Sequence, residues 1–172
     1  MEIEYNINRQ DYLDFNLFHT KYSETIRKAI FKNRYIISLS YFIFPLFALI
    51  TDIPAWYWLI LSILTYVIWI LVYPKYYEYK LNKIVSKILS EDKNNILGDK
   101  SISLEEEGII ASDISSESKT NWSGIVSIEE TENHIFIFKS SVSAYIIPIR
   151  AFINKDEKEN FMSILKSNTV KV

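Results

Sequence analysis

The chain has 172 residues, a formal net charge of −2 and no cysteine. Two long apolar runs take up about 40 residues, so the rest has room for one modest folded domain and none for a transporter core. The lack of cysteine excludes a disulfide scaffold, a thiol nucleophile and thiolate metal sites. The charge is uneven: residues 1–97 carry 11 Lys and Arg against 9 Asp and Glu, and residues 98–172 carry 8 against 12.

The region before the apolar runs predicts a strand and then a helix. In residues 1–10, Ile3, Tyr5 and Ile7 alternate with polar residues, as in a half-buried strand, and we expect this strand to join the sheet of the C-terminal region. Residues 11–34 carry apolar side chains at helical spacing and predict one amphipathic helix that leads into the membrane. The first 34 residues are too polar to be a signal peptide.

Residues 35–74 predict a transmembrane helical hairpin, because two uncharged runs are broken only by Asp52. The run at 53–74 would be roughly 33 Å long as an α-helix, which suffices for a hydrocarbon core of about 30 Å. The run at 35–51 would be only about 25 Å long, so Arg34 is expected to extend its side chain to the headgroups. Pro45 is expected to kink this first helix.

Basic residues lie at the outer ends of both runs, and none lies in the turn at 51–54. This asymmetry predicts that both termini are cytoplasmic. Aromatic and basic residues near the ends of the runs are expected to anchor the hairpin at the two interfaces: Arg34, Trp56, Tyr57, Trp58, Tyr73, Lys75 and Tyr76.

Residues 75–97 predict a second amphipathic helix and a linker, with lysines away from an apolar stripe. Two arrangements are open for the helical extensions of the hairpin. They could pack against each other, which we favour, or lie in the lipid headgroup layer. The polar stretch at 90–100 is expected to be the linker to the C-terminal region.

Residues 98–172 predict a small antiparallel β domain capped by a C-terminal helix. Short β-type segments recur about every 8–12 residues, as in a meander. The pattern then turns helical, with Asn154 as an N-cap and an apolar face that includes Phe161 and Leu165. The whole chain is therefore expected to be α+β, and its C-terminal region has the layout of a pleckstrin-homology-like (PH-like) domain.

The residues that could carry chemistry are few, and we predict no enzyme, no cofactor, no metal, no small-molecule substrate and no nucleic-acid partner. His19 and His134 lack the spacing to acids that a metal site or nucleophile relay needs, so they are expected at the surface or in packing. The acidic run at 105–107 is expected to be a solvated hairpin tip. The candidates for partner binding are Arg150, Trp122 and Phe152. An ion pair of Arg150 with Glu129, Glu130 or Glu132 and core positions for the two aromatic residues are the simpler expectations.

Several motifs resemble the YcxB-like membrane proteins of bacteria: residues 11–15 (DYLDF), 122–125 (WSGI), 129–131 (EET) and 145–152 (YIIPIRAF). The resemblance covers nearly the whole chain and implies a cytoplasmic PH-like domain with no established activity. Members usually have a basic residue directly after the proline, where this chain has Ile149, whereas Arg150 keeps the next basic position. The loop after the first strand, which holds inositol phosphates in some PH-like domains, is expected at residues 105–108, where acidic residues would repel them.

We therefore expect a non-enzymatic, multi-pass protein of the bacterial inner membrane. It would present a cytoplasmic PH-like binding or regulatory module that engages a protein partner or self-associates. The alternative is a small protective (immunity or stress) or permeation-modulating protein that acts through an oligomerised hairpin in the lipid bilayer.

Overall fold

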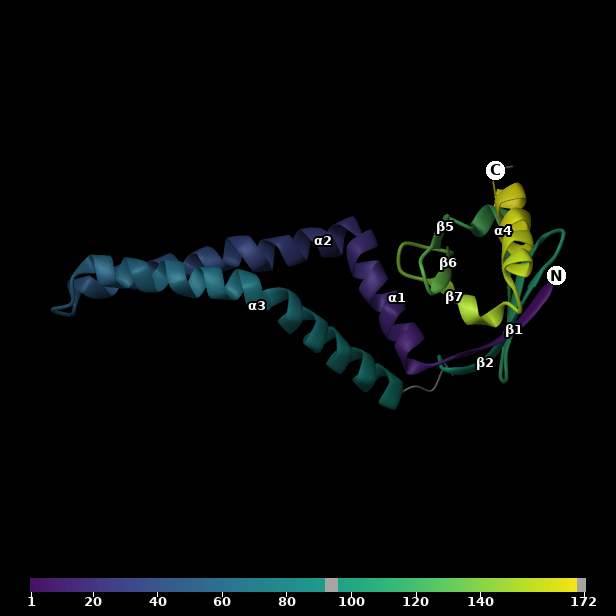
Figure 1. Ribbon diagram of the computed structural model, residues 1–172, viewed down its shortest axis with the longest axis horizontal. Coiled ribbons are helices and arrows are strands. Elements are labelled where there is room, and N and C mark those ends of the chain that lie inside the picture. Colours follow the sequence, from purple (N-terminus) through teal and green to yellow (C-terminus); the bar gives the residue numbers. More distant parts are fainter. Residues whose placement is uncertain (92–95, 170–172) are drawn as a thin grey trace. The chain divides into compact units, whose positions relative to one another are not determined.

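The computed structural model describes residues 1–91 and 96–169 (Figure 1). The chain forms two compact units, Met1–His19 with Val85–Val172, and Thr20–Ile84. In chain order the elements are β1 (Glu2–Ile7), α1 (Arg9–Tyr22), α2 (Glu24–Phe31), η1 (Lys32–Ile36), η2 (Ile37–Leu49), α3 (Ala55–Ser90), β2 (Gly98–Leu104), β3 (Gly108–Asp113), β4 (Glu117–Asn121), η3 (Trp122–Gly124), β5 (Ser127–Glu130), β6 (His134–Phe138), β7 (Ala144–Pro148), η4 (Ile149–Ala151) and α4 (Lys155–Thr169).

The first unit contains two antiparallel sheets, with strand orders β1-β2-β3-β4 and β5-β6-β7. β1 pairs with β2, so that Ile3 lies opposite Ile102 and Ile7 lies opposite Gly98. The N-terminal strand is thus part of the same sheet as strands that follow almost a hundred residues later. The α+β class expected from the sequence is confirmed, but β2 begins at Gly98, inside the stretch expected to be a linker, of which residues 92–95 lie outside the described part.

The main core lies between the two sheets and α4. Its fully buried members come from both sheets and the helix: Ile102, Ile109, Ile135, Ile137, Ile147, Phe161 and Leu165. α4 begins as predicted, because the Asn154 side chain accepts a hydrogen bond from the Glu157 N–H at 2.8 Å. The Glu157 carboxylate accepts one from the Ile153 N–H at 2.6 Å, which completes a reciprocal cap.

β6 is buried on both faces, and this explains its uninterrupted run of buried residues. Ile135 and Ile137 point into the main core, whereas Phe136 and Phe138 belong to a second apolar cluster with Phe15 of α1. The rings of Phe15 and Phe136 are 5.6 Å apart. Since alternate residues of a strand face opposite sides, α1 covers the side of β6 that α4 does not.

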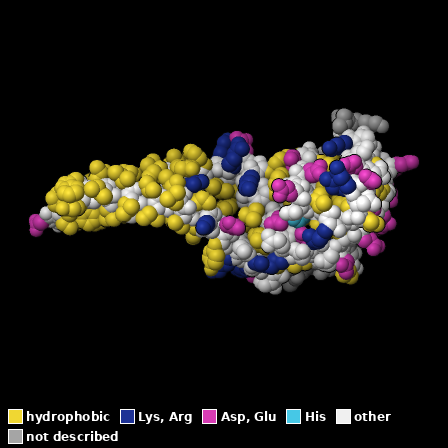
Figure 2. Space-filling model, in the orientation of Figure 1, with side chains coloured by type: hydrophobic (Ala, Val, Ile, Leu, Met, Phe, Trp, Pro, Cys, Tyr) yellow, Lys and Arg dark blue, Asp and Glu magenta, His cyan; other side chains and the backbone are white. Residues whose placement is uncertain are grey.

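The second unit is an antiparallel pair of helical segments. The rings of Phe47 and Trp58 are 5.5 Å apart, those of Phe42 and Tyr66 5.8 Å, and those of Tyr41 and Trp69 6.4 Å. Residues earlier in η2 contact residues later in α3, so the two segments run in opposite directions. The side chains on the outside are apolar and exposed, and Figure 2 shows this apolar surface along the segments.

The single amphipathic helix expected at 11–34 is wrong, because the helix is broken at Ser23. Ser23 has an extended backbone (φ −71°, ψ 116°), and α2 restarts directly after it. α2 has no buried residue, so the packing expected between the two helical extensions is not seen there, whereas Arg9 of α1 donates a hydrogen bond to the Ser86 hydroxyl of α3 at 2.8 Å. Serine readily takes such extended N-cap positions, whereas the apolar spacing continues across the break and conceals it.

The first apolar run is not a regular α-helix. η1 is a π-helical turn, and the 13 residues of η2 form a 3₁₀-helix that contains Pro45. With a rise of about 2.0 Å per residue, η2 alone spans roughly 26 Å. The first apolar run is therefore longer than the α-helical estimate for residues 35–51, and its length is closer to that of the second run.

α3 passes the length and hydropathy test for a membrane-spanning helix, the one described helix to do so. Only 6% of its most apolar window is buried, which is unlike a core helix of a soluble domain. The helix continues through Pro74 rather than ending there, and it is bent along its length in Figure 1. A proline inside a helix removes one hydrogen bond and bends the helix.

We predict that Gly108→Ala destabilises the first unit, whereas Gly124→Ala does not. A Cβ at Gly108 would overlap the Thr120 carbonyl oxygen, which is held in the β3–β4 ladder. At Gly124 the nearest atom is a methyl carbon of the Thr120 side chain at 3.3 Å, which can move. Thermal unfolding in mild detergent should show a loss of about 2 kcal/mol or more for Gly108→Ala and less than about 1 kcal/mol for Gly124→Ala. Equal losses would contradict the close strand approach.

Candidate functional site

The most unusual polar feature of the first unit is a cluster in which Asp11 and His134 are buried and the Arg150 side chain is 52% exposed. Asp11 is 2% exposed and His134 is 3% exposed. One Asp11 oxygen accepts hydrogen bonds from Arg150 Nη1 at 2.7 Å and from His134 Nε2 at 2.8 Å. The other accepts one from Arg150 Nη2, which also donates to the Asn6 carbonyl at 2.9 Å. We call these three residues the Asp11 cluster.

The start of α1 places Asp11. The Asn8 N–H donates to an Asp11 carboxylate oxygen at 2.8 Å, and the Asp11 N–H donates to the Asn8 side-chain oxygen at 3.0 Å. This reciprocal pair fixes the first turn of the helix directly after β1. The carboxylate is thereby aimed at His134, the first residue of β6, and at Arg150, which follows β7 in η4.

The electrostatics of the cluster favour a charged Asp11. Burial by itself raises the pKa of Asp11, but hydrogen bonds from Arg150, the Asn8 N–H and His134 outweigh burial and hold this pKa at about 2. The same contact with Asp11 raises the pKa of Arg150. Since a carboxylate only accepts hydrogen bonds, His134 donates through Nε2.

The sequence suggested an ion pair of Arg150 with Glu129, Glu130 or Glu132. In the structure Arg150 pairs with Asp11 instead. Glu130 instead pairs with Lys158 at 2.6 Å. The partner of Arg150 lies 139 positions earlier in the chain. The cluster thus joins the region before the apolar runs to the region after them and ties α1 to the sheets, while the Arg150 side chain remains half exposed.

A cleft of about 370 Å³ lies in the same unit. Apolar and aromatic side chains of β1, α1 and β7 form one part of its wall: Tyr5, Ile7, Tyr12, Phe15 and Ile146. Lys100, Asp113 and Lys139 add charge, with Lys100 Nζ 3.3 Å from Asp113 and Lys139 Nζ 4.1 Å from the centre of the Tyr145 ring. Burial raises the pKa of Tyr5, so its hydroxyl is neutral.

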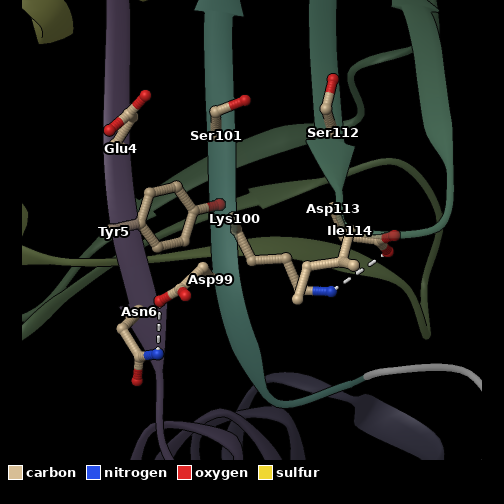
Figure 3. Close-up of a pocket in the computed structure, with 9 residues that line it drawn as sticks. All are labelled: Glu4, Tyr5, Asn6, Asp99, Lys100, Ser101, Ser112, Asp113 and Ile114. Atoms are coloured by element: carbon tan, nitrogen blue, oxygen red, sulfur yellow. Dashed lines mark hydrogen bonds and ion pairs between the residues drawn. The ribbon is translucent and has the colours of Figure 1, made fainter.

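A second, more open hollow of about 540 Å³ shares part of this lining. Figure 3 shows β1, β2 and β3 side by side there, with Lys100 bonded to Asp113 and Asn6 bonded to Asp99. Ile114 lines this hollow and Val142 lines the cleft, and these side chains are 84% and 68% exposed. Single exposed aliphatic side chains are common on protein surfaces, so these two residues do not by themselves indicate a partner.

Trp122 and Phe152, the other candidates for partner binding, lie in the main core. Trp122 is 8% exposed, and its indole N–H donates to the carbonyls of Glu105 and Glu106 at 3.2 and 3.1 Å. Phe152 is 9% exposed and packs edge-on against Phe161. Neither side chain is available to a partner, so the cleft replaces them as the candidate surface.

The acidic run at 105–107 is exposed, as expected, and Glu107 pairs with Lys119 at 2.6 Å. Our expectation that residues 105–108 form the loop after the first strand is wrong. β1 is the first strand of its sheet, and residues 105–107 connect β2 to β3. The connection after the first strand is instead the long segment with the apolar runs. The spacing of the β-type segments did not reveal this connection, because β1 and its partner β2 lie about 90 residues apart in the sequence.

The expected membrane anchors differ in exposure. Trp56 and Tyr57 are 54% and 52% exposed and stack on each other, and Tyr76 and Lys75 are also exposed. Trp58 packs against Phe47, and Tyr73 is buried beside Trp69. Arg34 is half-buried and donates from Nε to the Ile70 carbonyl at 3.1 Å.

Residues 104–165 match the family model described as YcxB-like protein. The match confirms the resemblance over this segment, which runs from the last residue of β2 into α4. His134 and Arg150 lie inside the matched segment, and Asp11 lies outside it. No curated protein and no solved structure matches the chain.

We predict that Asp11→Asn destabilises the first unit by about 2 kcal/mol, because Arg150 and His134 lose a charged acceptor that each of them bonds directly. Hydrogen exchange of the β6 amides in the intact protein measures this loss. Asp156→Asn is the matched control, since Asp156 is exposed near the start of α4. Equal protection in both variants would show that the cluster contributes nothing to stability.

The low pKa of Asp11 also predicts a pH dependence. The folded pKa is about 2 and the ordinary value is 3.8, so the ionised group stabilises the fold fully above about pH 4. That stabilisation is lost as the pH falls from about 4 towards 2. The difference in unfolding free energy between wild type and Asp11→Asn should shrink over this window. A difference that stays constant from pH 5 to pH 2 would contradict the low pKa.

Proposed function

We propose that this chain with a YcxB-like tail is a non-enzymatic integral membrane protein whose residues 35–74 cross the bilayer twice. Its remaining residues form a cytoplasmic PH-like module that binds a protein segment or a second copy of the chain. The pairing of β1 with β2 carries this proposal. Strands that share hydrogen bonds must lie on the same side of a membrane, so the segment between them has to cross an even number of times.

The exposure of the apolar runs supports the two crossings. α3 alone would place β1 and β2 on opposite sides, so the segment before it must cross as well. η2 runs antiparallel to α3, has about the required length and contains no charged residue. Large apolar side chains on both segments are exposed, among them Leu46 at 59% and Leu71 at 70%. Lipid tails would cover such surfaces. The basic residues at the outer ends favour cytoplasmic termini.

The strand order supports a PH-like module. A four-stranded and a three-stranded antiparallel sheet pack around one core that a C-terminal helix closes, and this is the layout implied by the family resemblance. The membrane hairpin then takes the place of the loop between the first two strands. In this arrangement the first connection is not a short loop of the kind that holds inositol phosphates in some PH-like domains, so we favour a protein as the ligand of the module.

The cleft supports binding of a protein segment. Its apolar wall, its few charged groups and the exposed Val142 would suit an extended chain with alternating side chains. The Asp11 cluster contains no nucleophile and points its charges at one another, so it supports a structural role in the module rather than catalysis.

Topology can be tested with single cysteines, because the natural chain has none. We expect Glu2→Cys and Ser167→Cys to resist a membrane-impermeant maleimide in intact cells and to react after lysis. Asp52→Cys, in the turn between the runs, should react in intact cells. Opposite labelling of the two terminal cysteines would mean an odd number of crossings and would overturn the proposal.

Partner binding can be tested with Val142→Cys and the matched control Ile153→Cys, which is 89% exposed and does not line the cleft. In inverted vesicles with cytosol, a short photoreactive label at position 142 should cross-link to protein and a label at 153 should not. Ala144→Trp, which fills the cleft, should abolish the adduct. Equal cross-linking from both positions, or an adduct that survives Ala144→Trp, would contradict the cleft as the binding surface.

A further inference from the structure

We propose that Arg34 forms a binding site for the phosphate group of an anionic phospholipid at the cytoplasmic end of the hairpin. This inference rests on the proposed membrane insertion and adds a specific lipid to it. It gives Arg34 a role different from that of a general interfacial anchor. The site lies within the second unit, where Arg34 of η1 meets α3.

The orientation of Arg34 follows from Pro74. Within an α-helix the Ile70 carbonyl would accept a hydrogen bond from the N–H four residues later, and that residue is Pro74, which has no N–H. Arg34 Nε fills this vacancy at 3.1 Å. The Arg34 carbonyl in turn accepts a hydrogen bond from the buried Ser38 hydroxyl at 2.7 Å. The side chain and its backbone are therefore held by both helical segments.

With Nε bonded to Ile70, the two terminal nitrogens of the guanidinium group are left for another ligand. Within residues 1–91 and 96–169, the other contact of the Arg34 side chain is with the Tyr35 ring, 5.1 Å from Cζ to the ring centre. The tyrosine face attracts the cation but accepts no strong hydrogen bond. The free edge of the guanidinium is thus a two-pronged donor with a fixed direction.

The charge of Arg34 has no acidic counterpart nearby in the sequence. Between Glu24 and Glu78 the chain contains one acidic residue, Asp52, which lies in the turn at the other end of the hairpin. A half-buried cation next to a hydrocarbon core is stabilised by a counterion. If the protein supplies none, the nearest abundant anion is the phosphate of a lipid headgroup at the same depth.

Neighbouring lysines strengthen the site without defining it. Lys32 lies in the same π-helical turn, and Lys75 follows Pro74 in α3; neither forms an ion pair in the described structure. Lys28, by contrast, is paired with Glu24 at 2.7 Å. Lysines attract anionic lipids as point charges, whereas a guanidinium can bind one phosphate through two parallel hydrogen bonds. The site therefore selects a phosphate held against Arg34.

The experiment must separate lipid binding from support of the helix. Arg34→Gln alone leaves the Ile70 carbonyl without its donor and could unfold the hairpin. Pro74→Ala removes this difficulty, because an alanine at that position supplies the missing backbone N–H, and the second lone pair of the Ile70 carbonyl oxygen can still accept a hydrogen bond from Arg34 Nε. The comparison is therefore between Pro74→Ala and the double variant Arg34→Gln/Pro74→Ala of the full chain, with Lys80→Gln/Pro74→Ala as the control for loss of one exposed charge.

Each protein is placed in nanodiscs of phosphatidylcholine with increasing phosphatidylglycerol, and bound lipid is counted by native mass spectrometry. We expect Arg34→Gln/Pro74→Ala to bind phosphatidylglycerol about 10- to 100-fold more weakly than Pro74→Ala, as for loss of one charged hydrogen-bonded pair. Lys80→Gln/Pro74→Ala should change binding less than about threefold. Arg34→Lys/Pro74→Ala should fall between them, because charge remains but the fork is lost.

Three outcomes would overturn the site. Unchanged lipid binding in Arg34→Gln/Pro74→Ala would show that Arg34 is not part of the site. Full binding in Arg34→Lys/Pro74→Ala would show that any positive charge suffices and that the guanidinium geometry plays no role. Competition by millimolar inorganic phosphate would make it a free-anion site. Carbonate extraction of each variant is run in parallel. A wild-type protein that is extracted would refute the proposed membrane insertion itself, which is a separate failure.

Discussion

The hydrogen bonds between β1 and β2 close a loop of the chain that contains both apolar runs. Neighbouring strands lie about 4.8 Å apart, so the two ends of this loop are held together by a sheet that forms in water. The fold of the first unit therefore restricts what the apolar segment can do, because it has to leave and return at one edge. The order of synthesis adds a constraint: β1 is made first, but its partner is made only after the apolar runs.

Two kinds of contact add to that closure and tie α1 to the sheets. The aromatic contact of Phe15 with Phe136 buries the outer side of β6, and the Asp11 cluster supplies a charged, directional contact at the start of the same helix. Apolar burial provides most of the stabilisation and tolerates sliding, whereas a carboxylate bonded to Arg150 and His134 fixes one position. Together they give α1 a defined position on the two sheets.

Features encoded by neighbouring residues could be predicted from the sequence. The alternation of Ile3, Tyr5 and Ile7 indicated a strand, and the spacing of Asn154 and Glu157 indicated a helix cap, since both depend on residues a few positions apart. The partner of Arg150 could not be predicted, because Asp11 lies 139 positions away and its own neighbours suggested only a helix start. The break at Ser23 was hidden because the apolar spacing continues across it.

The register of β1 with β2 brings the two ends of the apolar segment together at one end of the sheet. Ile7 and Gly98 lie opposite each other where the two strands end, and Gly98 has a positive φ of 107°, a conformation common in tight turns. The segment with the apolar runs is therefore an insertion at a position where a two-residue turn would suffice. Residues 98–172 by themselves lack the strand that covers β2 and would expose an unpaired edge. A chain in which a short turn joins Ile7 to Gly98 would restore the complete sheet in water, without α1 and its Asp11.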